Sequence, residues 1–493
     1  METKPIFEAP PARELSTAEL PVSIPALVAD LDGTVLKTDL LPESLLALLK
    51  QKPLCVFLLP IWLLKGRAYF KQEIARRVEL DASILPYRTE VLDYLERERL
   101  RGRRIVLATG SDIRLARQVA DHLKIFDRVL ASDGVTNLAG VEKRDRLVSI
   151  FGEQAFDYVA NAGRDLAVWS VARKAILVDP SPLLRARVTR VAKVERIFTH
   201  PRRSLVELVK PLRFRHWLKN VLLFVPLLAA HRVFEPALLE KAVLAFIAFG
   251  CCASGGYILN DLFDLAADRH HPDKRLRPFA AGDLPIAYGL ALLPVLVGLG
   301  TLIALLVSPL FLGVLWIYLA LTATYSLFAR KVVLLDVIVL AGLYTMRILA
   351  GSAAIAVWPS QWLLAFSTFL FFSLALVKRY GELVIMRRVD GQQAKARGYE
   401  LDDGELLAAM GVASGYVAVL VLALYVESDT AQTLYGRNEV IWFLCPLLLY
   451  WISHIWLSAH RGKMPDDPVV FATHDWVSRI LIALMLLVTV LAL

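Results

Sequence analysis

Three carboxylates and one amide lie close together between residues 260 and 268. Asn260, Asp264 and Asp268 are spaced four residues apart, so on a helix they share one face, with Asp261 beside them. The apolar run before them predicts a membrane-spanning helix, where three acids at the bilayer centre would cost about 8–10 kcal/mol together. Such a group is stable only in a wet cavity that a positive charge occupies. Oxygen ligands of this kind suit Mg²⁺, which commonly bridges to substrate phosphates.

Basic residues follow these acids directly. Lys274, Arg275 and Arg277 supply cations that can bind the phosphate groups of the same ligand. The segment therefore predicts a site in which the four residues of the acidic run bind Mg²⁺ and these three cations bind a diphosphate. A solvated, charged loop between helices is the structural alternative.

This run resembles the first acidic motif of the UbiA superfamily of intramembrane prenyltransferases. The stretch from Asp268 to Gly282 has the pattern Asp-Arg-x-His-Pro-x-Lys-Arg-x-Arg-Pro-x-Ala-x-Gly, which is most similar to the decaprenyl-phosphate phosphoribosyltransferase branch. The resemblance covers about residues 210–493. It implies an all-helical membrane transferase with Mg²⁺ as cofactor, a polyprenyl lipid as one substrate and a diphosphate-bearing donor as the other.

A second pair of acids lies near the N-terminus, where the apolar segment from Leu27 onward ends in Asp30, Asp32 and the turn residue Gly33. The two-residue period of a strand sends both acids to the same side. Such a pair can hold Mg²⁺ while one carboxylate attacks a phosphate and the other carries protons.

These residues resemble motif I of the haloacid-dehalogenase (HAD) phosphatases, and later segments match the remaining motifs in order over about residues 25–185. The matching segments are a strand over 103–107 leading to Thr109, Lys143 after the turn at 137–140, and a strand over 156–159 leading to Asn161 and Asp165. The resemblance implies the following roles: Asp30 as nucleophile, Asp32 as acid and base, Thr109 and Lys143 as phosphate ligands, and Asp165 as a Mg²⁺ ligand. Many relatives have Asp where this chain has Asn161, and Ala160 replaces a common glycine. A HAD fold retained as a non-catalytic scaffold is therefore the alternative.

The composition of the chain is uneven, which indicates two domains with different surroundings. Of 493 residues, 56% are hydrophobic, and the apolar runs concentrate after residue 218. We expect an α/β Rossmann-like HAD domain at 25–200 and an all-α, multi-pass membrane domain of about nine transmembrane helices at 210–493. The expected spans are 219–231, 241–259, 286–305, 308–326, 332–354, 361–377, 405–426, 438–458 and 474–493.

The cations of the membrane domain fall in alternate loops, namely 269–277, 330–331, 378–397 and 461–463. The positive-inside rule then places these loops, the acidic motif and the N-terminal domain in the cytoplasm of a cell whose inner membrane holds the protein. The first 25 residues show no signal-peptide pattern. The net charge of +9 predicts anionic lipid and phosphate partners rather than nucleic acid. Four cysteines form neither a disulfide framework nor a metal-binding pattern.

Other polar residues of the membrane domain also match the branch. The run from Arg213 through Trp217 to Lys219 and Asn220 resembles its Arg-Pro-x-Gln-Trp-x-Lys-Asn entry, with Phe-Arg-His in place of Pro-x-Gln. Lys219 is a candidate phosphate ligand, and a purely interfacial anchor is the alternative. Lys378 begins a run that resembles a Lys-Arg-x-x-Glu-Leu segment of the branch and is a second such candidate. Asp466, Asp467 and Asp475 match only weakly, and helix capping explains them equally well.

Tyr325 and Asp336 resemble the second UbiA region, but one acid is missing. Prenyltransferases of the superfamily usually carry Asp-x-x-x-Asp there, whereas this chain has Asp336 followed by Leu340. The smaller acidic charge favours a sugar diphosphate over a prenyl diphosphate. Arg347 lies farther along the same apolar span, where it would be costly without an anion, so we expect it to hold Asp336 or a lipid phosphate.

The apolar segment Pro53–Leu64 is too short to span a membrane and is flanked by lysines and an arginine. It is interpreted equally well as an interfacial segment that dips into the cytoplasmic leaflet or as a buried cap helix.

Together the two resemblances predict a UbiA-type membrane transferase that moves 5-phosphoribose from its 1-diphosphate to a polyprenyl phosphate. The product keeps a 5-phosphate, which the fused HAD domain can remove. One alternative is prenyl transfer from a polyprenyl diphosphate to an aromatic or other lipophilic acceptor. Another is a non-catalytic lipid-binding membrane protein.

Overall fold

The computed structural model describes residues 24–199, 205–389, 398–464 and 467–493. Residues 390–397 of the predicted basic loop, and Asp466, lie outside the described residues. The chain divides into two compact units, Met1–Arg202 and Arg203–Leu493, which are described separately below as the N-terminal unit and the membrane unit.

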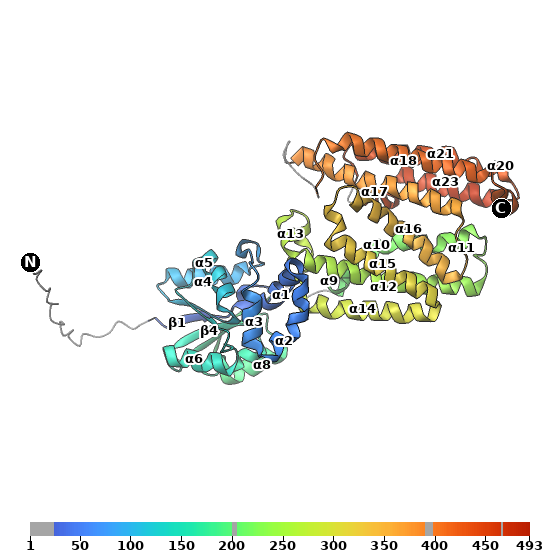
Figure 1. Ribbon diagram of the computed structural model, residues 1–493. Coiled ribbons are helices and arrows are strands. Elements are labelled where there is room, and N and C mark those ends of the chain that lie inside the picture. The colour runs from blue at the N-terminus through green and yellow to red at the C-terminus, as the bar shows by residue number, and fades with distance from the viewer. Residues whose placement is uncertain (1–23, 200–204, 390–397, 465–466) are drawn as a thin grey trace, which may run out of the picture. The chain divides into compact units, whose positions relative to one another are not determined.

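The N-terminal unit is built on one parallel six-stranded sheet (Figure 1). The strand order is β3-β2-β1-β4-β5-β6, in which β1 occupies the centre next to β2 and β4. The strands are β1 (Ala26–Ala29), β2 (Ile105–Asp112), β3 (Arg128–Ser132), β4 (Phe156–Ala160), β5 (Lys174–Val178) and β6 (Val194–Phe198). The three strands predicted from sequence are confirmed as β1, β2 and β4. Their nearly continuous apolar runs follow from burial on both faces.

Helices cover both faces of this sheet, and the side chains of β1 alternate between two cores. Leu27 and Ala29 face the core formed with α4 (Thr89–Leu100) and α5 (Ile113–Leu123). Ala26 and Val28 face the core formed with α6 (Val141–Phe151), α7 (Leu166–Trp169) and α8 (Pro182–Val191). Because all strands are parallel, the segments that follow β1, β2 and β4 meet at one edge of the sheet, where ligands of such folds bind. We call it the catalytic edge.

A helical insertion lies between β1 and β2. After the turn η1 (Leu31–Val35) come α1 (Leu40–Gln51), η2 (Pro53–Leu58), α2 (Leu59–Leu64), α3 (Arg67–Ala75) and η3 (Ala82–Ile84). Trp62 is buried with Leu48, Ile74 and Val78 in a small core of its own, which holds η2 and α2 against α1 and α3. The insertion is therefore a packed subdomain of the N-terminal unit.

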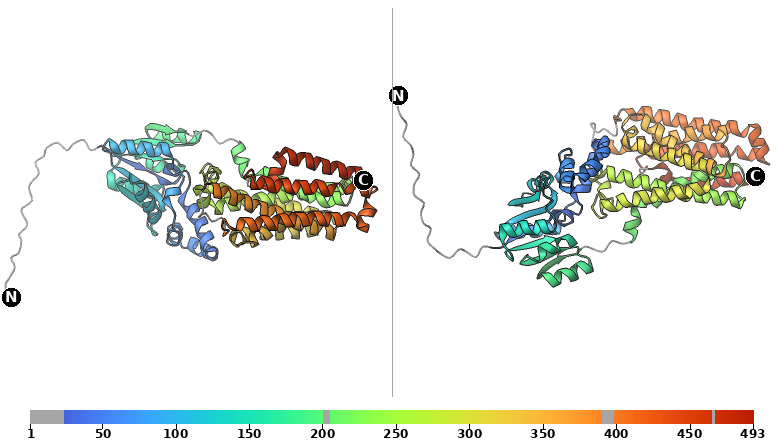
Figure 2. Two further views of the ribbon diagram at one scale, coloured as in Figure 1. Left: turned by 90° about the horizontal axis from the view of Figure 1, so that it is seen from above. Right: turned by 60° about the horizontal axis from the view of Figure 1, so that its bottom comes forward.

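The membrane unit is entirely helical, and its long helices lie side by side (Figure 2). Its first elements are short: α9 (Leu205–Val209), η5 (Lys210–Leu212), α10 (Phe214–Trp217), η6 (Leu218–Phe224) and α11 (Val225–Ala229). The middle elements are α12 (Pro236–Phe263), α13 (Leu265–His270), η7 (Lys274–Leu276), α14 (Ile286–Val307), α15 (Pro309–Leu327), η8 (Ala329–Lys331), α16 (Leu335–Ile355) and α17 (Gln361–Val389). The last are α18 (Asp403–Val426), α19 (Asp429–Leu434), α20 (Asn438–Ile441), α21 (Leu444–His460), α22 (Pro468–His474) and α23 (Trp476–Ala492).

Seven helices in the described ranges are long and apolar enough to cross a membrane, or eight if the bent pair of α22 and α23 counts as one crossing. The prediction of nine single spans is not reproduced. The first predicted span, 219–231, forms the short helices η6 and α11 instead, with Pro226 at the start of α11. Proline disrupts hydrogen bonding in a helix interior, so a single long helix is disfavoured here. This segment packs closely on α16, because a Cβ at Gly351 would lie 2.1 Å from the carbonyl oxygen of Leu223.

The last predicted span is also altered, since α22 and α23 meet at 88°. Asp475 adopts an extended backbone between them, and its carboxylate accepts the Ser478 N–H at 2.8 Å as the cap of α23. The same carboxylate lies 2.9 Å from His454 Nε2 on α21. The capping role that the sequence suggested for this residue is confirmed.

Candidate functional site

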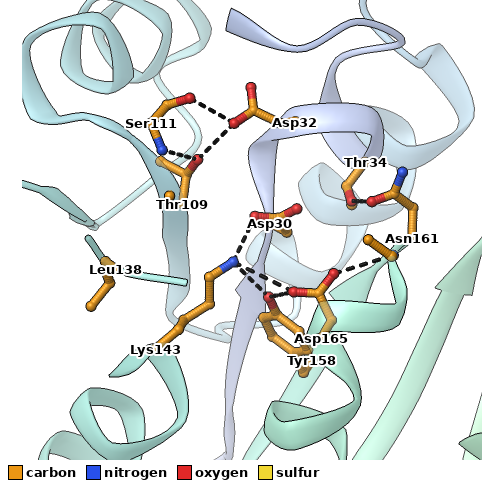
Figure 3. Close-up of polar contacts among 12 residues, drawn as sticks. Asp30, Asp32, Thr34, Thr109, Ser111, Leu138, Lys143, Tyr158, Asn161 and Asp165 are labelled. Atoms are coloured by element: carbon orange, nitrogen blue, oxygen red, sulfur yellow. Dashed lines mark hydrogen bonds and ion pairs between the residues drawn. The ribbon is translucent and has the colours of Figure 1, made fainter. Parts of the chain in front are cut away.

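A buried lysine organises the catalytic edge of the N-terminal unit (Figure 3). Lys143 Nζ, from α6, donates a 2.7 Å hydrogen bond to Asp30 Oδ1 at the end of β1 and lies 3.6 Å from Asp165 Oδ1. It also donates to the Tyr158 hydroxyl at 3.0 Å, and that hydroxyl donates to Asp165 Oδ1 at 2.9 Å. One cation and one hydroxyl thus join the carboxylates that follow β1 and β4.

The charges in this network favour one protonation state. Burial alone would lower the pKa of Lys143, but Asp30 and Asp165 outweigh burial and raise it above its ordinary value. Burial, followed by the charge of Asp165, raises the pKa of Tyr158 well above its ordinary value. Lys143 therefore stays charged and Tyr158 stays a hydrogen-bond donor at neutral pH.

Asp32 is separated from this lysine and is held by donors from other segments. Its Oδ1 accepts the Leu40 N–H at 2.8 Å, and its Oδ2 accepts the hydroxyls of Ser111 at 2.6 Å and Thr109 at 3.3 Å (Figure 3). Burial, and then the charge of Asp30, raises its pKa, which the Ser111 hydrogen bond partly offsets. A buried carboxyl with a raised pKa is suited to carrying a proton in acid–base chemistry.

Asn161 fits against the turn that follows β1. Its Oδ1 accepts the Thr34 hydroxyl at 3.3 Å, and its amide nitrogen would lie 2.1 Å from a Cβ at position 33. Gly33 also has φ +74°, a backbone conformation that glycine adopts without strain. Asn161 therefore stabilises the turn directly after Asp32 as well as lying at the catalytic edge.

The structure brings together every residue that the sequence assigned to this edge: Asp30, Asp32, Thr109, Lys143, Asn161 and Asp165. Sequence reasoning missed Tyr158 and Ser111. Strand periodicity could have indicated Ser111, because it is two residues beyond Thr109 and therefore on the same side of β2. Lys71, from α3, was also missed. Its Nζ donates to the Gly110 carbonyl at 2.6 Å and to Asn137 Oδ1 at 2.7 Å.

No group of three or more His, Cys, Asp or Glu side chains that could hold a metal ion occurs within the described residues. At the catalytic edge, Lys143 lies between the carboxylates that the prediction gave to Mg²⁺. One observation nevertheless suits a cation there: Asp30 Oδ2 is buried and has no hydrogen-bond partner. An unsatisfied carboxylate oxygen is costly unless it receives a ligand, so Asp30 fits both a metal ion and a phosphorus atom.

The acidic run of the membrane unit forms a network with arginines, which we call the open cluster. Its members are Asp261, Asp264 and Asp268 with Arg213, Arg277 and Arg330. Asp261 Oδ1 lies 2.5 Å from Arg213 and 3.1 Å from Arg277, which also binds Asp268 Oδ2 at 2.7 Å. Arg330 binds both oxygens of Asp264, at 2.5 and 2.7 Å.

The helix that carries these acids differs from the prediction in one respect. It breaks at Asp264, between α12 and α13, although the four-residue hydrogen bonds from Asp264 N–H to Asn260 and from Asp268 N–H to Asp264 continue. Asp261 and Asp268, seven residues apart, therefore share Arg277, while Asp264 turns to Arg330. Asn260 lines a separate, mainly apolar cavity of about 300 Å³ between α12, α14 and α15.

The arginines of the open cluster and Asp264 remain partly accessible to water, whereas Asp261 and Asp268 are buried. The side chains of Arg213, Arg277 and Arg330 keep 23, 29 and 22% of their surface exposed. Of the predicted phosphate ligands in this loop, only Arg277 enters the network. Lys274 is half-buried and Arg275 is exposed, and the structure shows hydrogen bonds for their backbone groups only.

A second acid–arginine group, which we call the closed cluster, surrounds Asp336 on α16. Its Oδ2 binds Arg379 Nε at 2.5 Å, and its Oδ1 accepts the Tyr399 hydroxyl at 2.5 Å. Arg379 also binds Glu382 and donates to the Tyr325 hydroxyl at 3.0 Å. Asp336 and Arg379 are 0 and 2% exposed, so the pair is shielded from solvent.

Arg347 does not hold Asp336, which corrects one of its two predicted roles. The two residues are eleven positions apart on α16, about 16 Å along the helix axis. Arg347 instead binds Asn220 Oδ1 at 3.2 Å and the Tyr318 hydroxyl at 3.0 Å. Its guanidinium is buried among aromatic rings without an acid partner within the described residues, so binding of a lipid phosphate stays a prediction.

Lys219 and Lys378 lie near the same region of the membrane unit. Lys219 Nζ binds Asp467 Oδ2 and lies 5.5 Å from the centre of the Tyr344 ring. Asp467 also caps α22, since its Oδ1 accepts the Val469 N–H at 3.0 Å. The sequence signal for Asp467 was thus too weak to reveal its second role as the partner of a buried lysine. Lys378 is half-buried and feels the charge of the same acid.

This chain is similar in sequence to a family of membrane enzymes and to several individual proteins. The sequence pattern of the UbiA prenyltransferase family matches residues 221–474. The "Uncharacterized protein y4nM" of Sinorhizobium fredii is 35% identical over 91% of this chain and 87% of that protein. The "Decaprenyl-phosphate phosphoribosyltransferase" of Mycobacterium tuberculosis is 31% identical over 58% of this chain and 94% of its own length. A solved UbiA homolog from Archaeoglobus fulgidus, bound to GPP and Mg²⁺, covers 57% of this chain and 99% of that chain at 16% identity, with a TM-score of 0.45.

Proposed function

Because this chain belongs to the UbiA prenyltransferase family, we propose that its membrane unit transfers 5-phosphoribose from the 1-diphosphate to a polyprenyl phosphate. The observation that carries the proposal is the open cluster, in which Asp264 and three arginines stay partly exposed beside the buried acids Asp261 and Asp268. Acids of this kind suit Mg²⁺, and arginines suit the diphosphate that such an ion accompanies. The name of the Mycobacterium tuberculosis relative supports this choice of donor.

The closed cluster supports a sugar diphosphate over a prenyl diphosphate. A second pair of acids would help hold a second Mg²⁺, but Leu340 stands where the second acid is expected. The remaining acid, Asp336, has both oxygens occupied by Arg379 and Tyr399. Of these acids, Asp264 of the first motif is 17% exposed, whereas Asp336 of the second region is fully buried.

The reaction needs a leaving group and an incoming nucleophile. An oxygen of the polyprenyl phosphate attacks the anomeric carbon of the ribose, and the bond from that carbon to the diphosphate breaks. When bound, Mg²⁺ would be held by Asp261, Asp264 and Asp268 and would supply positive charge to the departing diphosphate. Asn260, the fourth ligand expected from the sequence, faces the separate apolar cavity. Arg277 is placed to bind the same phosphates. Arg213, Lys219, Arg347 and Lys378 are the cations available for the acceptor phosphate.

We assign the N-terminal unit a HAD-type phosphatase activity that removes the 5-phosphate from the product. Asp30 Oδ2 attacks the phosphorus, and the ester oxygen leaves with a proton from Asp32. Water, losing a proton to Asp32, then attacks the phosphorus and releases phosphate and free Asp30. Thr109 and Lys143 bind the phosphate oxygens, and Asp165 is the proposed Mg²⁺ ligand. The alternation of loop charge supports a cytoplasmic position for both the open cluster and this unit.

The test uses the full-length protein in liposomes that contain polyprenyl phosphate and Mg²⁺. One reaction receives radiolabelled 5-phosphoribosyl 1-diphosphate and a parallel one receives labelled polyprenyl diphosphate with an aromatic acceptor. We expect label in the lipid phase from the sugar donor, and loss of transfer after removal of Mg²⁺ by EDTA. Transfer of the prenyl label alone would replace the proposal with prenyl transfer, and transfer of neither would favour a non-catalytic lipid-binding protein.

The phosphatase is tested on the same lipid product. Mass spectrometry of the product made by the Asp30→Asn variant is expected to show one phosphate group more than the product of the unmodified protein. Identical masses that both retain the 5-phosphate would identify the N-terminal unit as a non-catalytic scaffold. The transfer step is unaffected by either result.

A further inference from the structure

The insertion of the N-terminal unit exposes an unusual apolar surface, which we call the apolar patch. Leu54, Phe57 and Leu64 are 78, 74 and 88% exposed. The remaining members of the patch, Leu58, Ile61 and Leu63, are 40–55% exposed. All six lie in η2 and α2, within eleven consecutive residues. Contiguous exposed apolar side chains of this size mark a surface that another apolar phase covers.

The opposite side of these helices is anchored in protein. Trp62 is 5% exposed and packs with Leu48 and Ile74, and the Arg77 guanidinium lies 4.6 Å from the centre of its ring. The segment is therefore neither of the two simple predicted forms. It is a cap helix that buries one side and presents the other as an apolar surface.

The charged residues around the apolar patch indicate what kind of apolar surface covers it. Lys50, Lys52, Lys65 and Arg67 flank the patch on both sides and are exposed, whereas no acid occurs between positions 50 and 67. Apolar side chains edged by cations match the interface of an anionic bilayer, where the cations reach lipid headgroups while the apolar side chains enter the acyl boundary. A protein partner would have to supply an acidic rim around an apolar groove.

The N-terminal unit is tethered to the membrane unit by a short segment. The end of β6 at Phe198 and the start of α9 at Leu205 are seven residues apart in sequence, and the long apolar helices follow. A short connection to a membrane-embedded unit keeps the local concentration of lipid surface high, so even weak binding is populated.

We propose that the apolar patch docks the N-terminal unit onto the anionic leaflet of the membrane in which this chain resides. The patch is joined to the catalytic edge through α3, which packs on α2 and places Lys71 on the Gly110 carbonyl directly after Thr109. Docking holds this edge at the level of lipid headgroups. The ligand class that this favours is a phosphate ester carried on a membrane lipid.

The test measures lipid contact directly and does not depend on phosphatase activity. The full-length Cys55→Ser/Phe57→Cys variant is labelled with bimane, since Cys251, Cys252 and Cys445 are buried, and placed in liposomes that contain phosphatidylglycerol. We expect brominated acyl chains to quench the label by about half, as for an interfacial side chain. The matched control is Cys55→Ser/Val135→Cys, at a position that is 91% exposed and outside the patch, where no quenching is expected.

Two results would overturn docking on the membrane, and a third would overturn its dependence on anionic lipid. Quenching at position 57 by aqueous iodide, with no effect of brominated lipid, would place the patch in water. Blue-shifted emission insensitive to both quenchers would mean that protein covers it, either the membrane unit or a second copy of the chain. Equal lipid quenching in neutral phosphatidylcholine liposomes would refute the role of the flanking cations.

A second measurement, which rests on the proposed phosphatase, examines the consequence for substrate. The Leu54→Ser/Phe57→Ser/Leu64→Ser variant is expected to hydrolyse the lipid-linked ester about 10-fold more slowly than the unmodified protein. Hydrolysis of soluble p-nitrophenyl phosphate is expected to be unchanged. Equal loss on both substrates would indicate a damaged fold. Absence of any hydrolysis by the unmodified protein would refute the phosphatase but leave the bimane result to decide docking.

Discussion

The open and closed clusters use the same chemical groups in opposite surroundings. In the open cluster, Arg330 binds Asp264, and the two side chains are 22 and 17% exposed. In the closed cluster, Arg379 binds Asp336, and both are almost fully buried. Each member of a buried ion pair already has hydrogen-bond partners, so replacing them with a ligand stabilises the protein little. Separating the two buried charges is also costly. A water-accessible pair separates at small cost, because solvent screens both charges. Exposure, rather than residue type, therefore distinguishes Asp264, which is partly open to water, from Asp336, which is buried between helices.

The largest effect is expected at the open cluster. Asp264→Asn removes a charge that the proposed Mg²⁺–diphosphate complex needs, so we expect phosphoribosyl transfer to fall about 100- to 1000-fold. The measurement is initial transfer rate in liposomes, together with the unfolding temperature, which should change little. Asp283→Asn, an exposed acid farther along the same loop, is the control and should retain full activity. An Asp264→Asn variant with full activity would contradict the proposed role of the open cluster in transfer.

The closed cluster is expected to respond in stability instead of rate. Asp336→Asn leaves the Arg379 guanidinium buried with less compensating charge, which should cost about 3 kcal/mol or more of the free energy of unfolding. Differential scanning fluorimetry in detergent gives the shift, and transfer activity per folded molecule should stay near normal. The apolar pair Asp336→Leu/Arg379→Met is expected to recover much of the loss. A stable but inactive Asp336→Asn variant would contradict the assignment.

Replacing Arg330 with lysine tests whether the two-point contact with Asp264, and not only the positive charge, matters for donor binding. Arg330 contacts both oxygens of Asp264, and a lysine cannot form this planar, two-point contact. We expect Arg330→Lys to raise the KM for the diphosphate donor about 10-fold, with a smaller change in kcat. Arg232→Lys is the matched control, because Arg232 also binds a carboxylate through two nitrogens but lies in a different, exposed loop. An equal response of both variants would point to a general charge effect.

The smallest effect is expected at the catalytic edge of the N-terminal unit. This edge is buried like the closed cluster, but Asp30 Oδ2 has no hydrogen-bond partner there. Tyr158→Phe removes the hydroxyl that links Lys143 to Asp165 and should slow phosphate hydrolysis by up to about 10-fold, the free energy of one hydrogen bond. Transfer by the membrane unit should not change. Tyr87→Phe, whose hydroxyl binds the Ala82 carbonyl outside this edge, serves as control. Unchanged hydrolysis in Tyr158→Phe would limit this tyrosine to a structural role.

The catalytic edge was largely predictable because strand order fixes it. Apolar segments ending in polar residues predicted β1, β2 and β4, and parallel strands bring their ends together whatever the intervening chain does. Tyr158 was missed because a tyrosine within an apolar strand is more often a core residue. Its role depends on the placement of Lys143 from another element, which strand periodicity does not specify.

The partners of the membrane acids were less predictable. The acidic run indicated that Asp261, Asp264 and Asp268 belong to one site, but Arg330 and Arg213 reach it from distant segments. Sequence spacing carries no information about such contacts between helices. The same limit explains why Arg379, rather than Arg347, was found beside Asp336. The interruption of the first span was visible in Pro226 but had been outweighed by overall hydrophobicity.

The contact between Lys219 and Asp467 spans 248 residues of chain. Lys219 enters the membrane unit near its beginning, whereas its acid partner lies at the start of α22, after the seven long helices. The nascent protein must therefore shelter an uncompensated ammonium group while seven long helices are inserted. The acid that neutralises this charge becomes available only once the chain has been synthesised as far as Asp467. Truncation before residue 467 should yield a protein that membrane quality control recognises and degrades.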